Sequence, residues 1–261
     1  MATTGSGRAL LRYGSWAMVT GSTAGIGRAF ASELAAAGFN VALLARDAGQ
    51  LQAQCRELAS AWDIEAVAIP CDLGKPDYLP TITAATDALP IAFFVNNAGA
   101  ASYHGRFLER SAQDMEDCLN LNTAVQLRLI QHFATRMAAA HGGAIIQVSS
   151  IAGHMTLPFM AEYSASKAYQ LTLGEALYYE LKDHRIDFLT LSPGATRSRR
   201  VSYGMEPTPV VRTALAALGR QPSVIPGWRN KWSAFRHRHL KSRRAAVHSM
   251  GAFQRTQLRS D

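Results

Sequence analysis

Tyr163 and Lys167 stand four residues apart in a stretch whose apolar pattern predicts a helix. Residues at this spacing share one helix face, so we expect the phenol and the ammonium to be neighbours. A phenol has a pKa of about 10, and a nearby cation lowers that pKa by favouring the phenolate. Such a pair can give and take a proton, as a ketone requires when hydride reaches its carbon and charge builds on its oxygen. Most pairs of this kind are solvated helix charges, so the pair needs support from other motifs.

A glycine-rich turn from Thr20 to Gly27 follows the first predicted strand and opens a helical pattern. A dinucleotide pyrophosphate binds backbone N–H groups at a helix N-terminus, where glycines let the phosphates approach. Glycine also marks ordinary turns, but a place in the first strand–turn–helix unit favours phosphate binding. The candidate residues of this turn are Gly21, Ser22, Thr23, Gly25, Ile26 and Gly27.

Short apolar runs alternate with longer helical patterns, which is typical of strand–helix–strand units around a parallel sheet. The predicted strands are 17–20, 41–45, 66–70, 92–95, 144–148, 187–191 and 223–225. The predicted helices are 27–37, 48–62, 78–89, 112–140 and 162–183, with glycine caps at Gly38 and Gly142. The 261 residues, 48% of them apolar, therefore predict one α/β domain with a doubly wound seven-stranded parallel sheet of the Rossmann type.

Together these motifs resemble the short-chain dehydrogenase/reductase family of the single-domain TGxxxGIG and YxxxK type. The glycine turn has the family's spacing, with Thr20 in front, and Tyr163 and Lys167 fit YxxxK. The remaining matches lie at strand ends and on the helix before the fifth strand: Asp72, Leu73, Asn97, Ala98, Gly99, Asn122, Ser150, Pro193, Gly194 and Thr196. The resemblance covers about residues 20–196, most of the chain.

The resemblance implies a role for each matched residue. Tyr163 would be the general acid/base, and Lys167 would activate it and hold the nicotinamide ribose. Ser150 would position and polarise the carbonyl, with neighbouring Ser149 as its rival. Asn122 would keep a helix kink and a water path that relays protons to the lysine. The other matched residues would bind the cofactor together with Tyr163, Lys167 and the glycine turn.

The sequence indicates the substrate less clearly than it indicates the cofactor fold. The opening stretch, residues 12–46, resembles the branch of 3-oxoacyl reductases and 17β-hydroxysteroid dehydrogenases. That resemblance implies a lipophilic ketone or its secondary alcohol, such as an acyl thioester, a steroid or a biosynthetic intermediate. Gln147 and Ala100 depart from the family's common Asn and Gly, and we expect both to affect substrate fit. Four residues, Met155, Leu157, Phe159 and Met160, would line an apolar pocket or else only pack in the core.

The end of the second strand indicates which cofactor is used. An acidic residue there would bind the adenosine ribose of NAD and repel a 2′-phosphate. This chain has Arg46, which can form a charge-assisted fork to a phosphate, so we expect NADP(H) rather than NAD(H). Asp47 leaves open that Arg46 merely pairs with it. Arg28 is expected to be a solvated helix charge.

A movable cover over the substrate is implied by the resemblance for the irregular stretch after Thr196. It contains Arg197, Arg199 and Arg200, which could attract an anionic group or begin a solvated helix. The sequence leaves both interpretations open.

The formal net charge of +8 comes from the end of the chain. Residues 1–226 hold 18 basic and 18 acidic side chains, whereas residues 227–261 hold nine basic and one acidic. We therefore expect a catalytic domain at 1–226 and a basic helical extension at 227–261 that is separate from the chemistry. Trp228, Trp232, Phe235 and His239 form one helical stripe. Packing of this stripe on the sheet or on a second subunit is favoured over an anionic membrane surface.

The remaining expectations concern compartment and partners. Three cysteines without metal-ligand spacing predict buried thiols, no metal site and a reducing compartment. A cytoplasmic location is expected, because no secretory signal or membrane-length apolar run is found. Family analogy implies a homodimer or homotetramer without nucleic acid. Two alternatives stay open: a catalytically weak NADPH-binding regulator or sensor of the same fold, and an adaptor acting through the extension.

Overall fold

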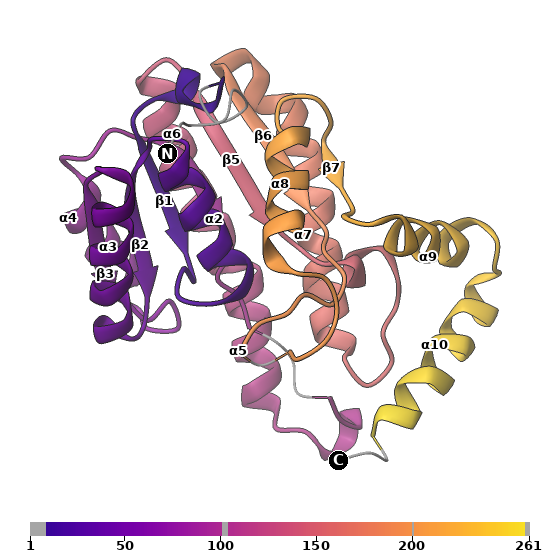
Figure 1. The fold of residues 1–261 in the computed structure, drawn as a ribbon. Helices are drawn as coiled ribbons and strands as arrows, with labels where there is room; N and C mark the ends of the chain where they lie inside the picture. The colour runs from indigo at the N-terminus through magenta and orange to yellow at the C-terminus, as the bar shows by residue number, and fades with distance from the viewer. Residues whose placement is uncertain (1–8, 101–103, 200, 259–261) are drawn as a thin grey trace.

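The computed structural model describes residues 9–100, 104–199 and 201–258 (Figure 1). Within these ranges seven parallel strands form one sheet in the order β3-β2-β1-β4-β5-β6-β7, which starts in the middle and winds outward both ways. The strands are β1 (Trp16–Thr20), β2 (Asn40–Ala45), β3 (Ala66–Pro70), β4 (Ile91–Asn96), β5 (Gly143–Val148), β6 (Ile186–Leu191) and β7 (Ser223–Val224). The predicted doubly wound sheet is confirmed.

Helices cover both faces of this sheet (Figure 1). One face carries α2 (Gly25–Ala36), α3 (Ala48–Trp62) and α8 (Pro207–Ala217). The other carries α4 (Tyr78–Thr86), α6 (Ala124–Ala139) and α7 (Ala161–Glu180), with α5 (Ala112–Asn122) beside α6 and α7. Short 3-10 turns lie at Ala9–Tyr13, Phe107–Glu109, Ile151–His154 and Leu181–His184. Strands buried on both faces explain the continuous apolar runs in the sequence.

Two neighbouring phenylalanines of β4 illustrate how the two cores are built. Phe93 and Phe94 point to opposite faces, as successive residues of a strand must. Phe93 meets Phe39 edge-on at a centroid distance of 5.6 Å, and Phe94 meets Phe133 of α6 at 4.4 Å. Both β4 side chains are fully buried. Each face of the sheet therefore has its own aromatic contact beneath the helices.

The single helix predicted for 112–140 is wrong. It is divided into α5 and α6 at Thr123, whose backbone (φ −122°, ψ −77°) is not helical. Asn122, the last residue of α5, uses its side chain to pair with the backbone of Ala100 in both directions, at 3.0 Å each. The apolar pattern continues across the break, so periodicity could not reveal it. The kink that the resemblance implied lies at this point.

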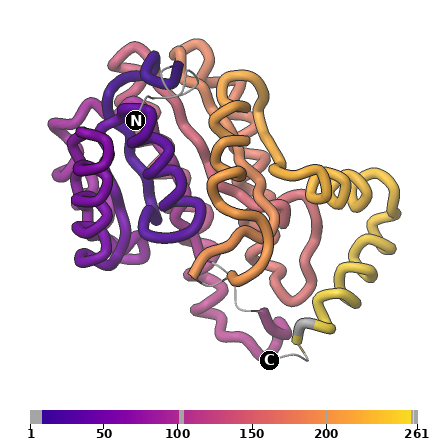
Figure 2. Tube along the Cα trace, viewed as in Figure 1, coloured from indigo at the N-terminus to yellow at the C-terminus, as the bar shows by residue number. Residues whose placement is uncertain are grey.

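The C-terminal extension consists of α9 (Trp228–His239) and α10 (Arg243–Gln257), which leave the body beyond β7 (Figures 1 and 2). In α9 it is Ala234 that is buried, and Asn230 lies against Gly194. Trp228 and Trp232 are 72% and 53% exposed, and Trp232 stacks on Phe235. The interpretation that the stripe packs on this chain's own sheet is wrong, because the small Ala234 permits a closer approach than an indole would.

The C-terminal extension also contacts the catalytic domain, although its excess positive charge led us to expect a separate segment. Helix α9 contacts the 3-10 turn Ile151–His154, which directly follows Ser150. Asn230 approaches Gly194 so closely that a Cβ on the glycine would lie 2.6 Å from its amide oxygen. The boundary at residue 226 stays a prediction, but residues on its C-terminal side contact predicted site segments.

The three cysteines lie inside the fold, and the helix lengths bear on whether the chain could cross a membrane. Cys55, Cys71 and Cys118 are free and buried, and burial raises the pKa of Cys71 to about 11. None of the helices in the described ranges is both long enough and apolar enough to cross a bilayer.

Candidate active site

The glycine turn between β1 and α2 is closed by residues that follow β4. Gly21 and Gly25 have positive φ angles of 65° and 51°, which residues other than glycine rarely adopt. A Cβ on Gly27 would collide with the backbone oxygen of Gly21, and one on Gly21 would lie 3.1 Å from the Cα of Ala98. The turn is therefore held in a shape that only glycine permits, with backbone N–H groups at the start of α2.

Asn97 fastens this turn to the end of β4. Its Nδ2 donates to the backbone oxygens of Thr20 and Gly21 at 2.9 and 3.2 Å. The Thr20 hydroxyl accepts from the backbone N–H groups of Asn97 and Ala98 at 2.9 and 3.0 Å. The side chain of Asn97, predicted as a cofactor ligand, is thus engaged in holding the turn.

A cleft of about 710 Å³ opens at the carboxyl ends of β1 to β4. Eight of the predicted cofactor residues line it: Gly21, Thr23, Arg46, Asp72, Leu73, Asn97, Ala98 and Gly99. Ser22 is fully buried, and it lies outside the lining together with Gly25, Ile26 and Gly27. The glycine cradle and the volume fit a dinucleotide, because such sites lie at this edge of a doubly wound sheet.

Two arginines from distant parts of the chain share one end of this cleft. Arg46 and Arg199 both line it. The Arg199 guanidinium donates to the Thr23 hydroxyl at 3.1 Å and to Gln50 Oε1 at 2.5 Å. Arg197 instead pairs with Glu206 at 2.8 Å, and Arg200 lies outside the described residues. The sequence left open whether these arginines attract an anionic group or begin a solvated helix, and the loop brings Arg199 over the glycine turn.

Asp47 is engaged elsewhere, which bears on the alternative left open for Arg46. As N-cap of α3, Asp47 accepts hydrogen bonds from the backbone and side chain of Gln50 at 2.9 and 2.5 Å. These bonds to Gln50 lower the pKa of the carboxyl. Within the described ranges no ion pair joins Asp47 to Arg46. Arg28, exposed at the start of α2, pairs with Glu57 at 2.7 Å.

Ser150 and Tyr163 are brought together, whereas Ser149 points elsewhere. The Ser150 hydroxyl lies beside the Tyr163 phenol, close enough to lower the pKa of the phenol. The Ser150 hydroxyl also accepts from the backbone of Ala152 at 3.1 Å, which holds it at the start of the 3-10 turn. Ser149 is buried and donates to the backbone oxygen of Lys167 at 2.8 Å. The thirteen-residue spacing therefore selects the serine that faces the phenol.

Lys167 lies under Tyr163 on the same helix, with its Nζ 5.7 Å from the ring centroid. Burial lowers the pKa of Lys167 to about 8. Burial also raises the pKa of Tyr163, and the neighbouring Ser150 hydroxyl opposes that effect. The predicted lowering of the tyrosine pKa by Lys167 is thus not found, because burial of the phenol raises that pKa and Lys167 is not among the groups that shift it.

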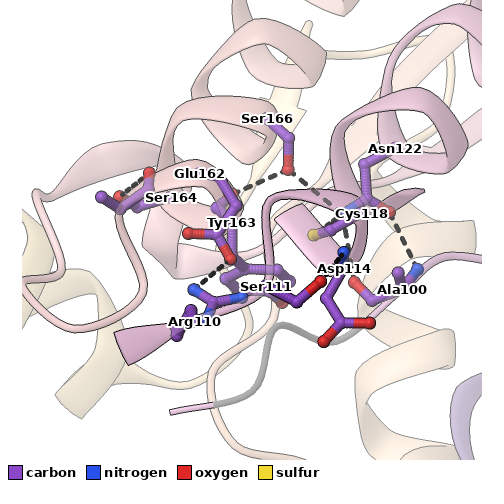
Figure 3. Close-up of polar contacts among 11 residues, drawn as sticks. Ala100, Arg110, Ser111, Asp114, Cys118, Asn122, Glu162, Tyr163, Ser164 and Ser166 are labelled. Atoms are coloured by element: carbon purple, nitrogen blue, oxygen red, sulfur yellow. Dashed lines mark hydrogen bonds and ion pairs between the residues drawn. The ribbon is translucent and has the colours of Figure 1, made fainter. Parts of the chain in front are cut away.

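Asn122 sits where α5, α7 and the loop after β4 meet (Figure 3). Besides its bonds to Ala100, its Nδ2 donates to the Ser166 hydroxyl at 3.1 Å and contacts the Cys118 sulfur at 3.6 Å. Ser166 in turn donates to the backbone oxygen of Tyr163 at 2.8 Å. Asn122 therefore ties the helix that carries Tyr163 to the turn that lines the cofactor cleft.

Sequence reasoning missed two buried groups in this neighbourhood. Gln170 is 2% exposed and lies between Lys167 and Asn122. Arg110 forms an ion pair of 2.5 Å with Glu162, the residue before Tyr163, and both side chains are less than 10% exposed (Figure 3). The only feature of the sequence that points to Glu162 is its place beside Tyr163. Arg110 lies 52 positions earlier, and no local sequence pattern predicts that the two residues pair.

Gln147, which we expected to affect substrate fit, contacts two other buried amides instead. It is buried in β5, accepts from Asn96 Nδ2 at 2.9 Å and donates to Gln126 Oε1 at 3.2 Å. Gln126 also donates to the backbone oxygen of Ala98. The glutamine thus supports the Asn-Ala-Gly turn from behind, because a longer amide reaches both neighbours.

The segment after β6 borders the same region. Pro193 accepts a hydrogen bond from the backbone of Ile151 at 2.8 Å, and Thr196 donates to the oxygen of Gly194 at 3.0 Å. A Cβ on Gly25 would lie 3.0 Å from the Cβ of Ser198, so the cover stretch touches the glycine turn. Pro193, Gly194 and Thr196 are therefore held between the start of α9 and the cofactor cleft.

Known proteins share these features. A sequence model of the short chain dehydrogenase family matches residues 15–205. The 7β-hydroxysteroid dehydrogenase of Collinsella aerofaciens is 29% identical over 94% of this chain and 98% of its own. The very-long-chain 3-oxoacyl-CoA reductase of Anas platyrhynchos is 32% identical over 86% of this chain and 78% of its own.

Solved structures agree with the sequence relatives. A 7β-hydroxysteroid dehydrogenase superposes with a TM-score of 0.87 at 27% identity, covering 92% of this chain and 98% of that one. A short-chain dehydrogenase from Sphingobium yanoikuyae, in complex with NADPH, gives 0.76 at 28% identity over 95% and 96%. The chain therefore belongs to the short-chain dehydrogenase family, in its hydroxysteroid and oxoacyl reductase branch, and is an oxidoreductase of alcohol and ketone groups.

Proposed function

We propose that the protein reduces a lipophilic ketone, or oxidises the corresponding secondary alcohol, with NADP(H). The observation that carries this proposal is the meeting of three side chains: the Ser150 hydroxyl lies beside the Tyr163 phenol, and the buried Lys167 Nζ lies 5.7 Å from the tyrosine ring centroid. When bound, the nicotinamide supplies or accepts the hydride. Tyr163 donates the proton to the carbonyl oxygen, and Ser150 positions that oxygen by hydrogen bonding. Lys167, as an ammonium, stabilises the phenolate left behind.

The remaining predicted site residues have supporting parts in this proposal. Asn122 holds the Tyr163 helix against the cofactor turn, and it organises proton exchange near Lys167. Gly21 and Thr23 face the pyrophosphate, and Ser22, Gly25, Ile26 and Gly27, which lie outside the cleft lining, hold the shape of the turn. The lining residues Asp72, Leu73, Ala98 and Gly99 contact the adenosine half, and Pro193, Gly194 and Thr196 the nicotinamide half, beside Tyr163 and Lys167.

The preference for NADP(H) rests on two positive charges at one end of the cleft. A 2′-phosphate there would meet the guanidinium groups of Arg46 and Arg199. The described lining of the cleft contains two carboxylates, Asp72 and Asp47, and Asp47 is engaged as the N-cap of α3. Charge-assisted bonds from arginine favour a phosphate over a ribose hydroxyl. The relative solved with NADPH adds support by analogy.

Replacing Arg46 tests the cofactor preference. Arg46→Asp should lower kcat/KM for NADPH roughly 10- to 100-fold, as expected for one charged hydrogen bond, while kcat/KM for NADH stays equal or rises. Arg199→Ser should act in the same direction. Arg28→Ser is the matched control, because Arg28 is exposed on α2 and engaged by Glu57, and it should leave both values unchanged. A wild type that uses NADH as well as NADPH would contradict the preference.

A cleft of about 530 Å³ with a mixed apolar and polar lining offers apolar contacts to a lipophilic substrate. It lies between Pro158 and Phe159 on one side and α10 on the other. Met155, Leu157, Phe159 and Met160 are half-buried, and none of them belongs to either core cluster, so core packing does not account for them. Phe159 has a φ of 70°, a strained conformation for an aromatic residue of the kind often kept for a binding role.

Replacing Phe159 tests this contact. Phe159→Gly removes the ring and suits the positive φ, so KM for a bulky ketone should rise roughly 10- to 100-fold without a matching loss of thermal stability. Affinity for NADPH should not change. Phe253→Ser is the control, since Phe253 is an exposed α10 aromatic outside this cleft. An unchanged KM in Phe159→Gly would remove Phe159 from the substrate site.

The activity itself is tested by NADPH consumption at 340 nm over a ketone panel. The panel holds a 7-oxosteroid, a 17-oxosteroid, a 3-oxoacyl thioester and a bulky diaryl ketone. Turnover of at least one member is expected. Saturable NADPH binding without turnover of any member would instead favour the regulator or sensor alternative.

Location and assembly are proposed with the function. A cytoplasmic homodimer or homotetramer, without nucleic acid, is the arrangement that the free thiols and family analogy favour. The exposed aromatic stripe of α9 is the surface for self-association, in preference to a membrane. Light scattering on Trp232→Ser should then report a smaller particle than the wild type, and an unchanged mass would exclude the stripe.

A further inference from the structure

Gln170 joins Lys167 to the end of α5 through both ends of its amide. Lys167 Nζ donates to Gln170 Oε1 at 2.9 Å. Gln170 Nε2 donates to the backbone oxygen of Asn122 at 2.8 Å. Gln170 follows Lys167 by three residues on α7, so the two share a helix face, and its side chain is 2% exposed. The amide is therefore fixed in the protein interior beside the lysine.

The backbone of Asn122 determines which way this amide points. A carbonyl oxygen can only accept hydrogen bonds, so the NH₂ end of Gln170 must face Asn122. The oxygen end is then turned toward Lys167. The Gln170 oxygen, as an acceptor, favours the charged ammonium form of Lys167. If the amide were reversed, the ammonium would instead meet two donor hydrogens. The break between α5 and α6 thus has an electrostatic consequence for the lysine.

Other groups around Lys167 give it less support. The Val148 backbone oxygen on β5 accepts from Nζ at a longer distance, 3.3 Å. The titratable groups that face the lysine are Tyr163 on its own helix and Cys118 on α5. Burial raises the pKa of the Cys118 thiol, which keeps it neutral near pH 8. The Arg110–Glu162 ion pair acts on Cys118 and is not among the causes that shift the pKa of Lys167.

We propose that Gln170 is a positioning residue that keeps Lys167 protonated and directed toward Tyr163 during the reaction. The proposal rests on the proposed function, in which Lys167 must be an ammonium to stabilise the tyrosine phenolate. It also gives Asn122 a second task, because its carbonyl orients the amide. A purely structural clamp between α5 and α7 would lower stability without changing the protonation of the lysine.

The protonation of Lys167 can be measured without turnover, because the chain has five lysines. Lysine labelled with ¹³C at Cε gives five NMR signals, and the one lost in Lys167→Arg identifies Lys167. In the wild type its titration midpoint should lie at about 8. Gln170→Met removes the acceptor and should lower the midpoint by about one unit, a tenfold change in the ratio of charged to neutral lysine. Gln170→Glu places a carboxylate at the same site and should raise the midpoint.

Opposite shifts in the two variants would support the proposal, and equal midpoints in wild type and Gln170→Met would overturn it. If Gln170→Met does not fold, the direction of the shift in the near-isosteric Gln170→Glu decides the question. Cys55→Ala is the control and should leave the midpoint unchanged, since this buried thiol lies on α3 and is not among the causes that shift the pKa of Lys167.

The pH profile of ketone reduction separates this inference from the proposed function. The alkaline limb should move with the NMR midpoint, to lower pH in Gln170→Met and to higher pH in Gln170→Glu. A midpoint that moves while the limb stays fixed would contradict the role given to Lys167. A fixed midpoint with an intact wild-type limb would contradict only the role given to Gln170.

Discussion

Tyr163→Phe should abolish ketone reduction, with kcat falling by about 10³-fold or more, as loss of a general acid predicts. The substitution removes one hydroxyl and leaves the ring and the helix in place. Ser150 keeps its bond from the Ala152 backbone, so the 3-10 turn should keep its shape. NADPH affinity should persist, because the cleft at the ends of β1 to β4 is built from other residues. Steady-state kinetics with NADPH fluorescence titration measure both quantities.

A matched control lies on the same helix. Tyr169 is 38% exposed on α7, and Tyr169→Phe removes a hydroxyl without touching Ser150 or Lys167, so it should retain wild-type activity. Near-normal turnover in Tyr163→Phe would refute the assignment of the general acid. Loss of NADPH binding together with activity would show that the phenol is needed for the cofactor instead.

Lys167→Met should lower kcat for reduction by about 10²-fold or more and remove the alkaline limb of the pH profile. The direction of this pH dependence follows from the lowered Lys167 pKa of about 8. Below this pH the lysine is an ammonium and supports the reaction. Above it the charge is lost and the rate falls. Folding should be retained, because the substitution removes a buried charge whose desolvation is unfavourable.

The pH profile of kcat/KM tests this prediction directly. The wild type should decline above a pH of about 8, and Lys167→Met should give a low, flat profile through that region. Lys182→Met is the control, since Lys182 is a lysine after α7 that lies over the Tyr178 ring, 4.1 Å from its centroid. A limb at the same pH in Lys167→Met would assign the titration to another group.

The fold could be predicted because its determinants are local. Strands such as β4 and β5 are buried on both faces and so produce short apolar runs, and the glycine caps at Gly38 and Gly142 both have positive φ. Motif spacing likewise placed Ser150 and Tyr163 in contact, since one strand end and one helix start fix both side chains. Local patterns were sufficient wherever neighbouring elements define the geometry.

Contacts between distant segments could not be predicted in the same way. Gln170 and the carbonyl of Asn122 are 48 positions apart, and Arg199 and Thr23 are 176 apart. Neither pairing leaves a periodic or compositional signal. Helix α10 lies within the predicted helical extension but was not distinguished as a second helix, because none of its described side chains is buried and it therefore has no apolar face of the usual width. The Asn122 break was hidden by an apolar pattern that continues through it.

The central claim is that this protein transfers hydride between NADPH and a ketone with Tyr163 as the acid. It is tested by reduction of the panel ketone that the wild type turns over fastest, using NADPH with both C4 hydrogens of the dihydronicotinamide replaced by deuterium, with the product analysed by mass spectrometry. We expect deuterium on the carbinol carbon of the alcohol formed by the wild type, and no product from Tyr163→Phe. An alcohol that carries no deuterium, or equal product from both proteins, would contradict it.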